Sequence, residues 1–264
     1  MSQPANINTL FQTANEEGTL SPASLQSLIT IPDMGATIQA ALGVSVGDIH
    51  ASEVVLVTMM MDDSGSIRFA GNAQNMRDGH NLVVQAYIES KQENQVLMHT
   101  RYLNGYVLYP YSKLGQVVLM TPQNYDPQLG TPLYDQSVVL LGTVLAKAQE
   151  FSDNAVPVRT VTLISSDGAE AHSRHSTARD VANIVGDMLR TEQHIVAGMG
   201  IHDGSTDFRR VFGGMGIRDE WILTPKNTKS EIRKAFGTFS KSAVRASQSA
   251  ASFSQTAVGG FGEP

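Results

Sequence analysis

The stretch VVLVTMMMDDSGSIRF, residues 54–69, places an apolar run directly before two acids and two serines. Residues 54–61 indicate a strand covered on both faces, because parallel strands between two helical layers are apolar on both sides. Two adjacent carboxylates repel each other, and the hydroxyls of Ser64 and Ser66 add little to a hydrophobic core. We therefore predict that the residues at the end of this strand use their side-chain oxygen atoms to bind a ligand.

The rest of the chain alternates strands with helices. Further strands are expected at 95–112, as a hairpin around Asn104-Gly105, and at 159–168, 194–201 and 220–224. Helices are expected at 74–90, 133–150, 177–190, 207–217 and 229–247. This spacing is typical of βαβ units. It predicts an α/β fold with a doubly wound, mostly parallel sheet, one antiparallel edge strand and helices on both faces.

The two ends of the chain depart from this alternation. Residues 1–50 are interpreted as an N-terminal extension packed on the main domain, with about the first 15 residues loose. Residues 51–245 form the main domain in this prediction. Residues 246–264 are rich in Ser, Ala and Gly and are expected to be a flexible tail; their sequence is ASQSAASFSQTAVGGFGEP.

Composition narrows the functional classes. The 264 residues carry a formal net charge of −6 and no cysteine. Nucleic acid is not expected as a partner, because phosphate binding requires clustered Lys and Arg. Disulfides and cysteine-bound zinc are excluded. With neither a signal peptide nor a run of roughly 20 apolar residues, we expect no membrane partner and a cytoplasmic location.

Five oxygen-bearing side chains are expected at the carboxyl ends of the strands, where doubly wound sheets bind ligands. They are Asp62, Ser64, Ser66, Thr131 and Asp167. In an extended or gently curled loop, residues two apart point the same way, so the pattern Asp-x-Ser-x-Ser can converge on one point. Carboxylates and hydroxyls without His or Cys suit magnesium or manganese rather than zinc or copper.

These residues resemble the metal-ion-dependent adhesion site of von Willebrand factor type A (vWA) domains. The resemblance spans roughly residues 52–243 and rests on Asp62-x-Ser64-x-Ser66, on Thr131 in GTPLYD and on Asp167 in ISSDG. One departure is Ser166, where the family usually has Thr. The resemblance implies a Rossmann-like vWA fold in which the five side chains hold Mg²⁺, or Mn²⁺ or Ca²⁺, some of them through water.

The resemblance also implies a function. It indicates a metal-dependent protein–protein interaction module, not an enzyme, in which the metal binds an Asp or Glu carboxylate of a partner. A cysteine-free version without a signal peptide is similar to the intracellular bacterial members. Those commonly act beside AAA+ ATPases or kinase–phosphatase stress modules, so such a partner is expected by analogy.

Each residue also has a plainer interpretation. Thr131 before Pro132 is typical of a helix start, with Thr as the N-cap. Asp63 is expected to point away from the metal, as a solvated or turn-bonding acid. His172 and His175 are expected in a solvent-exposed loop rather than on a metal.

Enzymatic alternatives fit less well. A haloacid-dehalogenase-type phosphatase needs an acid two residues after Asp62, where this chain has Ser64. A response-regulator receiver needs the acid before the Thr, whereas Thr131 precedes Asp167 here. A serine hydrolase needs flanking glycines around its Ser. A metal-dependent hydrolase or phosphatase stays open as an alternative, as does a structural assembly component that uses the metal for folding only.

Overall fold

A computed structural model describes residues 7–92, 94–248 and 260–261 of the chain. Its sheet contains the strands β1 (Val54–Met61), β2 (Val96–Tyr102), β3 (Val107–Lys113), β4 (Val158–Ser166), β5 (His194–Gly200) and β6 (Ile222–Leu223). Every residue of β1, β2 and β5 is buried, as expected for strands between two layers of helices.

The six strands lie in the order β3-β2-β1-β4-β5-β6. Strand β1 pairs in parallel with both β2 and β4, and β4 with β5 and β5 with β6 are also parallel. Only β3 runs antiparallel, paired with β2 through the turn at Gly105, whose φ of 97° suits glycine. The predicted fold class is therefore confirmed, including the hairpin and its antiparallel edge strand.

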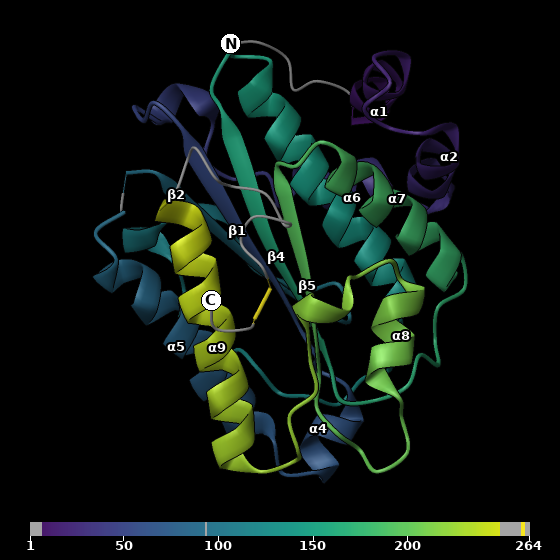
Figure 1. Ribbon diagram of the computed structural model, residues 1–264, viewed down its shortest axis with the longest axis vertical. Helices are drawn as coiled ribbons and strands as arrows, with labels where there is room; N and C mark the ends of the chain where they lie inside the picture. The colour runs from purple at the N-terminus through teal and green to yellow at the C-terminus, as the bar shows by residue number, and fades with distance from the viewer. Residues whose placement is uncertain (1–6, 93, 249–259, 262–264) are drawn as a thin grey trace.

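Helices cover both faces of the sheet (Figure 1). On one face, α5 (Ala73–Glu89) packs against α9 (Lys229–Gln248). The other face carries α6 (Leu133–Ser152) and α7 (Ala178–Arg190), with α8 (Phe208–Gly214) beside α7 and β5. The short α4 (Gly65–Phe69) follows β1, and three-residue 3₁₀ helices lie at η1 (Val46–Asp48), η2 (Leu114–Gln116) and η3 (Asp219–Trp221).

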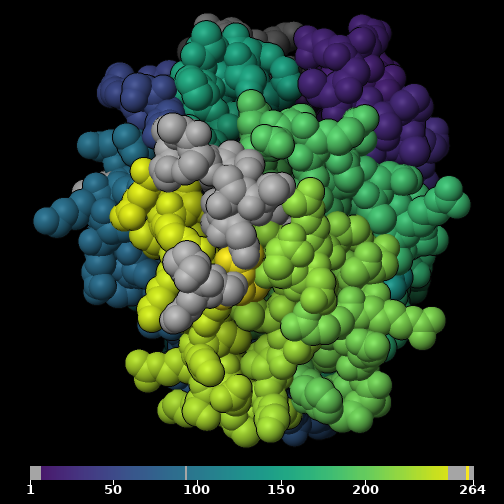
Figure 2. All heavy atoms as spheres, viewed as in Figure 1, coloured from purple at the N-terminus to yellow at the C-terminus, as the bar shows by residue number. Residues whose placement is uncertain are grey.

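The N-terminal extension forms three helices, α1 (Ile7–Glu16), α2 (Pro22–Thr30) and α3 (Met34–Gln39). The expectation that about the first 15 residues are loose is wrong from Ile7 onward, because Ile7 and Phe11 are buried in the main core. A Cβ on Gly142 of α6 would come within 2.8 Å of Leu28 and 3.5 Å of Phe11, so the extension packs directly on that helix. Figure 2 shows its purple atoms against the green surface of the later helices.

The C-terminal boundary also needs a correction. Helix α9 continues to Gln248, three residues into the segment predicted as a flexible tail. The ring of Phe261 lies 5.1 Å from that of Trp221 and 6.4 Å from that of Phe239, and its N–H donates to the carbonyl of Glu220. This part of the tail therefore packs on the domain. Residues 249–259 and 262–264 lie outside the described residues.

Candidate metal site

The site lies where the strand order reverses. The connections from β1 and β4 lead to opposite sides of the sheet, so the loops after these two neighbouring strands diverge and leave room for a ligand. Asp62 directly follows β1, and Asp167 directly follows β4. Helix α4, which begins after Ser64, marks this end of the sheet in Figure 1.

Four of the five predicted side chains lie together there. The hydroxyl oxygens of Ser64 and Ser66 are 2.8 Å apart, and the Ser66 hydroxyl donates to Asp167 Oδ1 at 2.5 Å. The backbone N–H of Asp167 donates to Asp62 Oδ2 at 3.0 Å. Asp62, Ser64 and Asp167 are buried, whereas Ser66 is exposed, so solvent reaches the cluster from the side of Ser66.

Protein donors hold the carboxylate of Asp62 in place. The N–H of Ser64 donates to Oδ1 at 2.7 Å, and the hydroxyl of Ser166 donates to Oδ2 at 2.9 Å. The backbone carbonyl of Asp62 accepts a hydrogen bond from the buried hydroxyl of Tyr125. Asp62 is therefore oriented before any ligand arrives, and the hydroxyl kept at position 166 takes part in that orientation.

In the part of the chain that the structure describes, three carboxyl groups lie at this strand end without a protein cation beside them. Burial raises the pKa of Asp62, and it raises the pKa of Asp167 to about 7, with repulsion from Asp62 as the next cause. Burial likewise raises the pKa of Asp63 to about 7. Among the described residues, no ion pair includes any of these three carboxylates. Two oriented buried carboxylates beside two hydroxyls fit a hard divalent cation, which would supply the missing positive charge.

Thr131 is buried close to this cluster but does not touch it by a hydrogen bond within the described chain. Two residues earlier, Leu129 pairs with Ser64, and its carbonyl accepts the N–H of Gly65 at 2.9 Å. Thr131 is not a cap either, since the residue before α6 is Pro132 and no side-chain cap bond forms there. The hydroxyl of Thr131 is thus not committed to the helix, and its place as a fifth ligand stays a prediction.

The loop after β4 caps helix α6 instead. The carboxylate of Glu170 accepts from the N–H of Tyr134 at 3.0 Å, and the hydroxyl of Ser173 accepts from the same N–H at 3.0 Å. In return, Asp135 of α6 accepts from the backbone N–H groups of residues 174–176. These reciprocal bonds fix the Thr131 loop relative to the Asp167 loop.

The structure also describes Asp63, His172 and His175, which we did not expect to bind the metal. Asp63 is turn-bonding rather than solvated: it is buried, and its Oδ1 accepts from the N–H of Asn104 at 3.0 Å. His172 and His175 are exposed, as expected. His172 nevertheless has a local role, because its Nδ1 accepts from the N–H of Thr131 at 2.8 Å and its ring lies against Gly130.

An apolar rim adjoins the cluster. The side chain of Phe69 is 92% exposed and that of Leu129 is 54% exposed. A recess of about 310 Å³ is lined by Phe69, Ile201 and Asp203 together with Ser66 and Asp167 of the cluster. Large exposed apolar side chains beside a polar cluster are typical of interaction surfaces.

The candidate site contains only two carboxylates among its five expected ligands. In the described residues, no group of three or more His, Cys, Asp or Glu side chains could hold a metal ion. The candidate here has two carboxylates and otherwise hydroxyls, so it is a different kind of site. Separately, none of the helices within the described ranges is both long and apolar enough for a membrane span.

Comparison with known proteins adds information on the fold. No protein-family model matches the sequence, and no curated protein is significantly similar to it. The solved pilus adhesin SpaC from Lactobacillus rhamnosus GG, in its open conformation, is 11% identical over 74% of this chain with a TM-score of 0.52. The match covers 30% of the adhesin, so this chain corresponds to less than a third of its length.

Two further solved structures are more distant. The SpRpn10 VWA domain is 9% identical, with a TM-score of 0.47 over 80% of this chain and 99% of that domain. The manganese-loaded TRAP protein of Plasmodium vivax is 15% identical, with a TM-score of 0.38 over 70% of this chain and 74% of that one. Neither is close enough to bear on the site. The likeness to SpaC shows the fold alone, and with the strand order it agrees with the predicted Rossmann-like vWA fold.

Proposed function

We propose that this chain is a metal-dependent protein-interaction module. Asp62, Ser64, Ser66, Thr131 and Asp167 hold Mg²⁺, or Mn²⁺ or Ca²⁺, and an Asp or Glu carboxylate of a partner protein completes the coordination. The observation that carries this proposal is the pair of buried, oriented carboxylates without a protein cation, set beside two hydroxyls 2.8 Å apart.

The available charge explains why a partner carboxylate is favoured. Mg²⁺ requires about six oxygen ligands, and this site offers five side chains, three of them neutral. The charge of Asp62 is shared among two backbone N–H groups and the Ser166 hydroxyl. An incoming carboxylate therefore finds an incompletely compensated cation, and a charge-assisted contact of this kind is strong where water is partly excluded.

The apolar rim supports a protein partner rather than a free small acid. Phe69, whose ring lies near Gly65, and Leu129, which pairs with Ser64, offer exposed contact area beside the loop that carries the two serines. Aromatic residues beside a polar centre often dominate the energetics of protein interfaces. A partner segment would place its acid on the metal and pack its neighbouring residues on this rim.

The cellular setting is proposed by family analogy only. We place the protein in the bacterial cytoplasm, where its partner belongs to an AAA+ ATPase or a kinase–phosphatase module. The partner is recovered by pull-down with the full chain in MgCl₂ and in EDTA, with Thr131→Ala as the site variant. Recovery in MgCl₂ that is lost in EDTA and with Thr131→Ala supports the proposal.

A structural role of the metal has a different signature. If Mg²⁺ only raises the melting temperature and the recovered partner binds equally in MgCl₂ and EDTA, the metal serves folding and the proposed interaction is refuted. The partner can be tested in the same way, by changing a single Asp to Asn or a single Glu to Gln in the partner. This change should abolish binding in MgCl₂.

A further inference from the structure

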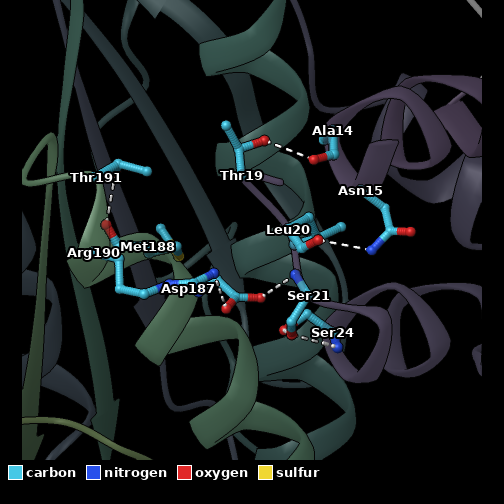
Figure 3. Close-up of polar contacts among 10 residues, drawn as sticks. All are labelled: Ala14, Asn15, Thr19, Leu20, Ser21, Ser24, Asp187, Met188, Arg190 and Thr191. Carbon is cyan, nitrogen blue, oxygen red and sulfur yellow. Dashed lines mark hydrogen bonds and ion pairs between the residues drawn. The ribbon is translucent and has the colours of Figure 1, made fainter. Parts of the chain in front are cut away.

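A second cavity lies at the far end of the molecule from the candidate metal site. It has a volume of about 290 Å³ and lies between the N-terminal extension and helices α6 and α7. In Figure 1, α1 and α4 occupy opposite ends of the molecule, which separates the two sites. Figure 3 shows the polar contacts at its edge, where the chain from Thr19 to Ser24 approaches Asp187.

Apolar side chains from both parts of the chain line this cavity. Phe11, Ala14 and Leu20 come from the extension, and Ala148 and Met188 come from α6 and α7. The volume is at the lower end of the roughly 300–1,000 Å³ typical of small-molecule sites. Because the walls come from two parts of the chain, a bound molecule would contact the extension and the main domain together.

One buried polar group in the lining lacks a complete set of partners. His194, the first residue of β5, is 4% exposed and lines the cavity. Its Nδ1 lies 2.8 Å from the hydroxyl of Thr160, whereas its Nε2 has no hydrogen-bond partner among the described residues. Burial lowers the pKa of His194 to about 4, so the imidazole is neutral at pH 7. In the tautomer whose Nδ1–H donates to the Thr160 hydroxyl, Nε2 can accept a hydrogen bond from a ligand.

Two carboxylates line the cavity, those of Glu17 and Asp187. Asp187 is already engaged, by the N–H of Ser21 at 2.7 Å and by Arg190 Nη2 at 2.6 Å. Glu17 also lines the cavity, and its exposed carboxylate makes no hydrogen bond or ion pair with another described residue. In the described part of the chain, no Lys or Arg lines the cavity. Because Arg190 neutralises Asp187, Glu17 is the charge that favours a cation over an anion in this cavity.

We propose that this cavity binds a small organic amine with an aromatic or alkyl body. The apolar body packs between Phe11 and Met188, and the ammonium group donates hydrogen bonds to the open acceptors of the lining. This inference is independent of the metal site and of the proposed protein partner. It gives the N-terminal extension a ligand-binding role.

The test uses the full chain with two ligands of similar size and opposite charge, phenethylamine and phenylacetate, by calorimetry and by NMR titration. We expect the amine to bind at least about tenfold more tightly than the acid, a difference of about 1.4 kcal/mol. The variant Glu17→Gln should remove most of this preference. Glu16→Gln is the matched control, since Glu16 is an exposed neighbour outside the lining, and it should bind as the wild type does.

A second variant keeps the inference testable from the apolar side. Ala148→Leu adds three carbons to the lining and should weaken amine binding while the circular dichroism spectrum stays unchanged. The proposal is overturned if neither ligand binds, if the acid binds as tightly as the amine, or if Glu17→Gln and Glu16→Gln behave alike. Mg²⁺ affinity should be the same in all these variants, so failure here is distinct from failure of the metal site.

Discussion

The backbone N–H of Asp167 donates a hydrogen bond to the carboxylate of Asp62 at 3.0 Å. This bond joins the ends of β1 and β4, two strands that are more than 90 residues apart in sequence but neighbours in the sheet. It brings two acids together despite their mutual repulsion, and it fixes the direction from which Asp62 presents its oxygens. The metal proposal depends on this arrangement.

The variant Asp62→Asn removes the negative charge of Asp62 but keeps one side-chain oxygen as a hydrogen-bond acceptor. The amide oxygen still accepts a bond, but the loss of charge should weaken Mg²⁺ binding by more than the roughly 10–100-fold typical of outer-shell changes. Calorimetric titration with MgCl₂ measures this effect. The control is Asp126→Asn, which changes an exposed acid in the segment before α6 and should bind normally. Equal affinity for both variants would contradict the role of Asp62.

Asp62→Ala should behave differently from Asp62→Asn when metal is removed. It leaves the N–H groups of Ser64 and Asp167 without their acceptor, whereas the Ser166 hydroxyl can still donate to the carbonyl of Gly168. An unsatisfied buried donor costs about 1–3 kcal/mol, which outweighs the relief of repulsion. Urea unfolding in EDTA should therefore show Asp62→Ala to be less stable than Asp62→Asn. The opposite order would mean that repulsion dominates at this strand end.

Glu170 is predicted to support the site without touching a metal. Its carboxylate accepts from the N–H groups of Tyr134, His172 and Ser173. Glu170→Gln replaces one acceptor oxygen by a donor and should loosen the Thr131 loop, which lowers Mg²⁺ affinity by roughly 10–100-fold. Amide hydrogen exchange at Tyr134 and Ser173 should rise in parallel. Unchanged exchange together with weaker binding would place Glu170 at the metal instead.

The rim residue Phe69 is predicted to act on the partner alone. Phe69→Ser should leave Mg²⁺ affinity unchanged and weaken binding of the recovered partner by about thirtyfold or more, the range of an interface hot spot. Ile29→Ser removes another exposed apolar side chain, on α2 in the extension, and serves as the control. A partner that is indifferent to Phe69→Ser must bind on another side of the site.

Buried histidines predict a pH effect on folding. Burial lowers the pKa of His80 to about 4, against an ordinary value of 6.5. The unfolded chain therefore takes up a proton that the folded chain refuses, and this residue's contribution to stability is lost as the pH falls from about 6.5 to about 4. The difference is on the order of 3 kcal/mol.

A substitution of His80 separates its contribution to the pH dependence of stability from those of other groups. The raised pKa values of Asp63 and Asp167 act in the opposite direction, because the folded state keeps their protons between about pH 4 and 7. The total pH profile therefore does not report on His80. The free energy of unfolding of His80→Gln, measured in urea from pH 7 to pH 4, should fall less steeply than that of the wild type. Parallel profiles would show that His80 is protonated in the folded state.

The sequence predicted those features that depend on local pattern. The apolar run before Asp62, the hairpin at Asn104-Gly105 and the helical periodicity after Leu133 each follow from the period of their side chains, and all three are present. The convergence of Asp62 with Asp167 followed from the rule that parallel strands end at one edge of a sheet.

Features that depend on tertiary contacts were out of reach. Helix α1 has no acid in its first turn and no base in its last turn, and its burial depends on the fit of Phe11 on Gly142. The capping of α6 by Glu170 and Ser173 joins segments 36 to 39 residues apart, so the pair Thr131-Pro132 gave the wrong cap. The packing of Phe261 on Trp221 likewise depends on a partner far away in the sequence.

Manganese-edge anomalous diffraction from crystals of the full chain soaked in MnCl₂ tests the central claim most directly. The account predicts one strong peak at the ends of β1 and β4, with the hydroxyl oxygens of Ser64 and Ser66 within roughly 2.0–2.5 Å of it. Asp62, Thr131 and Asp167 should lie in direct or water-bridged contact with the same peak. A peak elsewhere, or none at this strand end in MnCl₂-saturated crystals, would contradict the account.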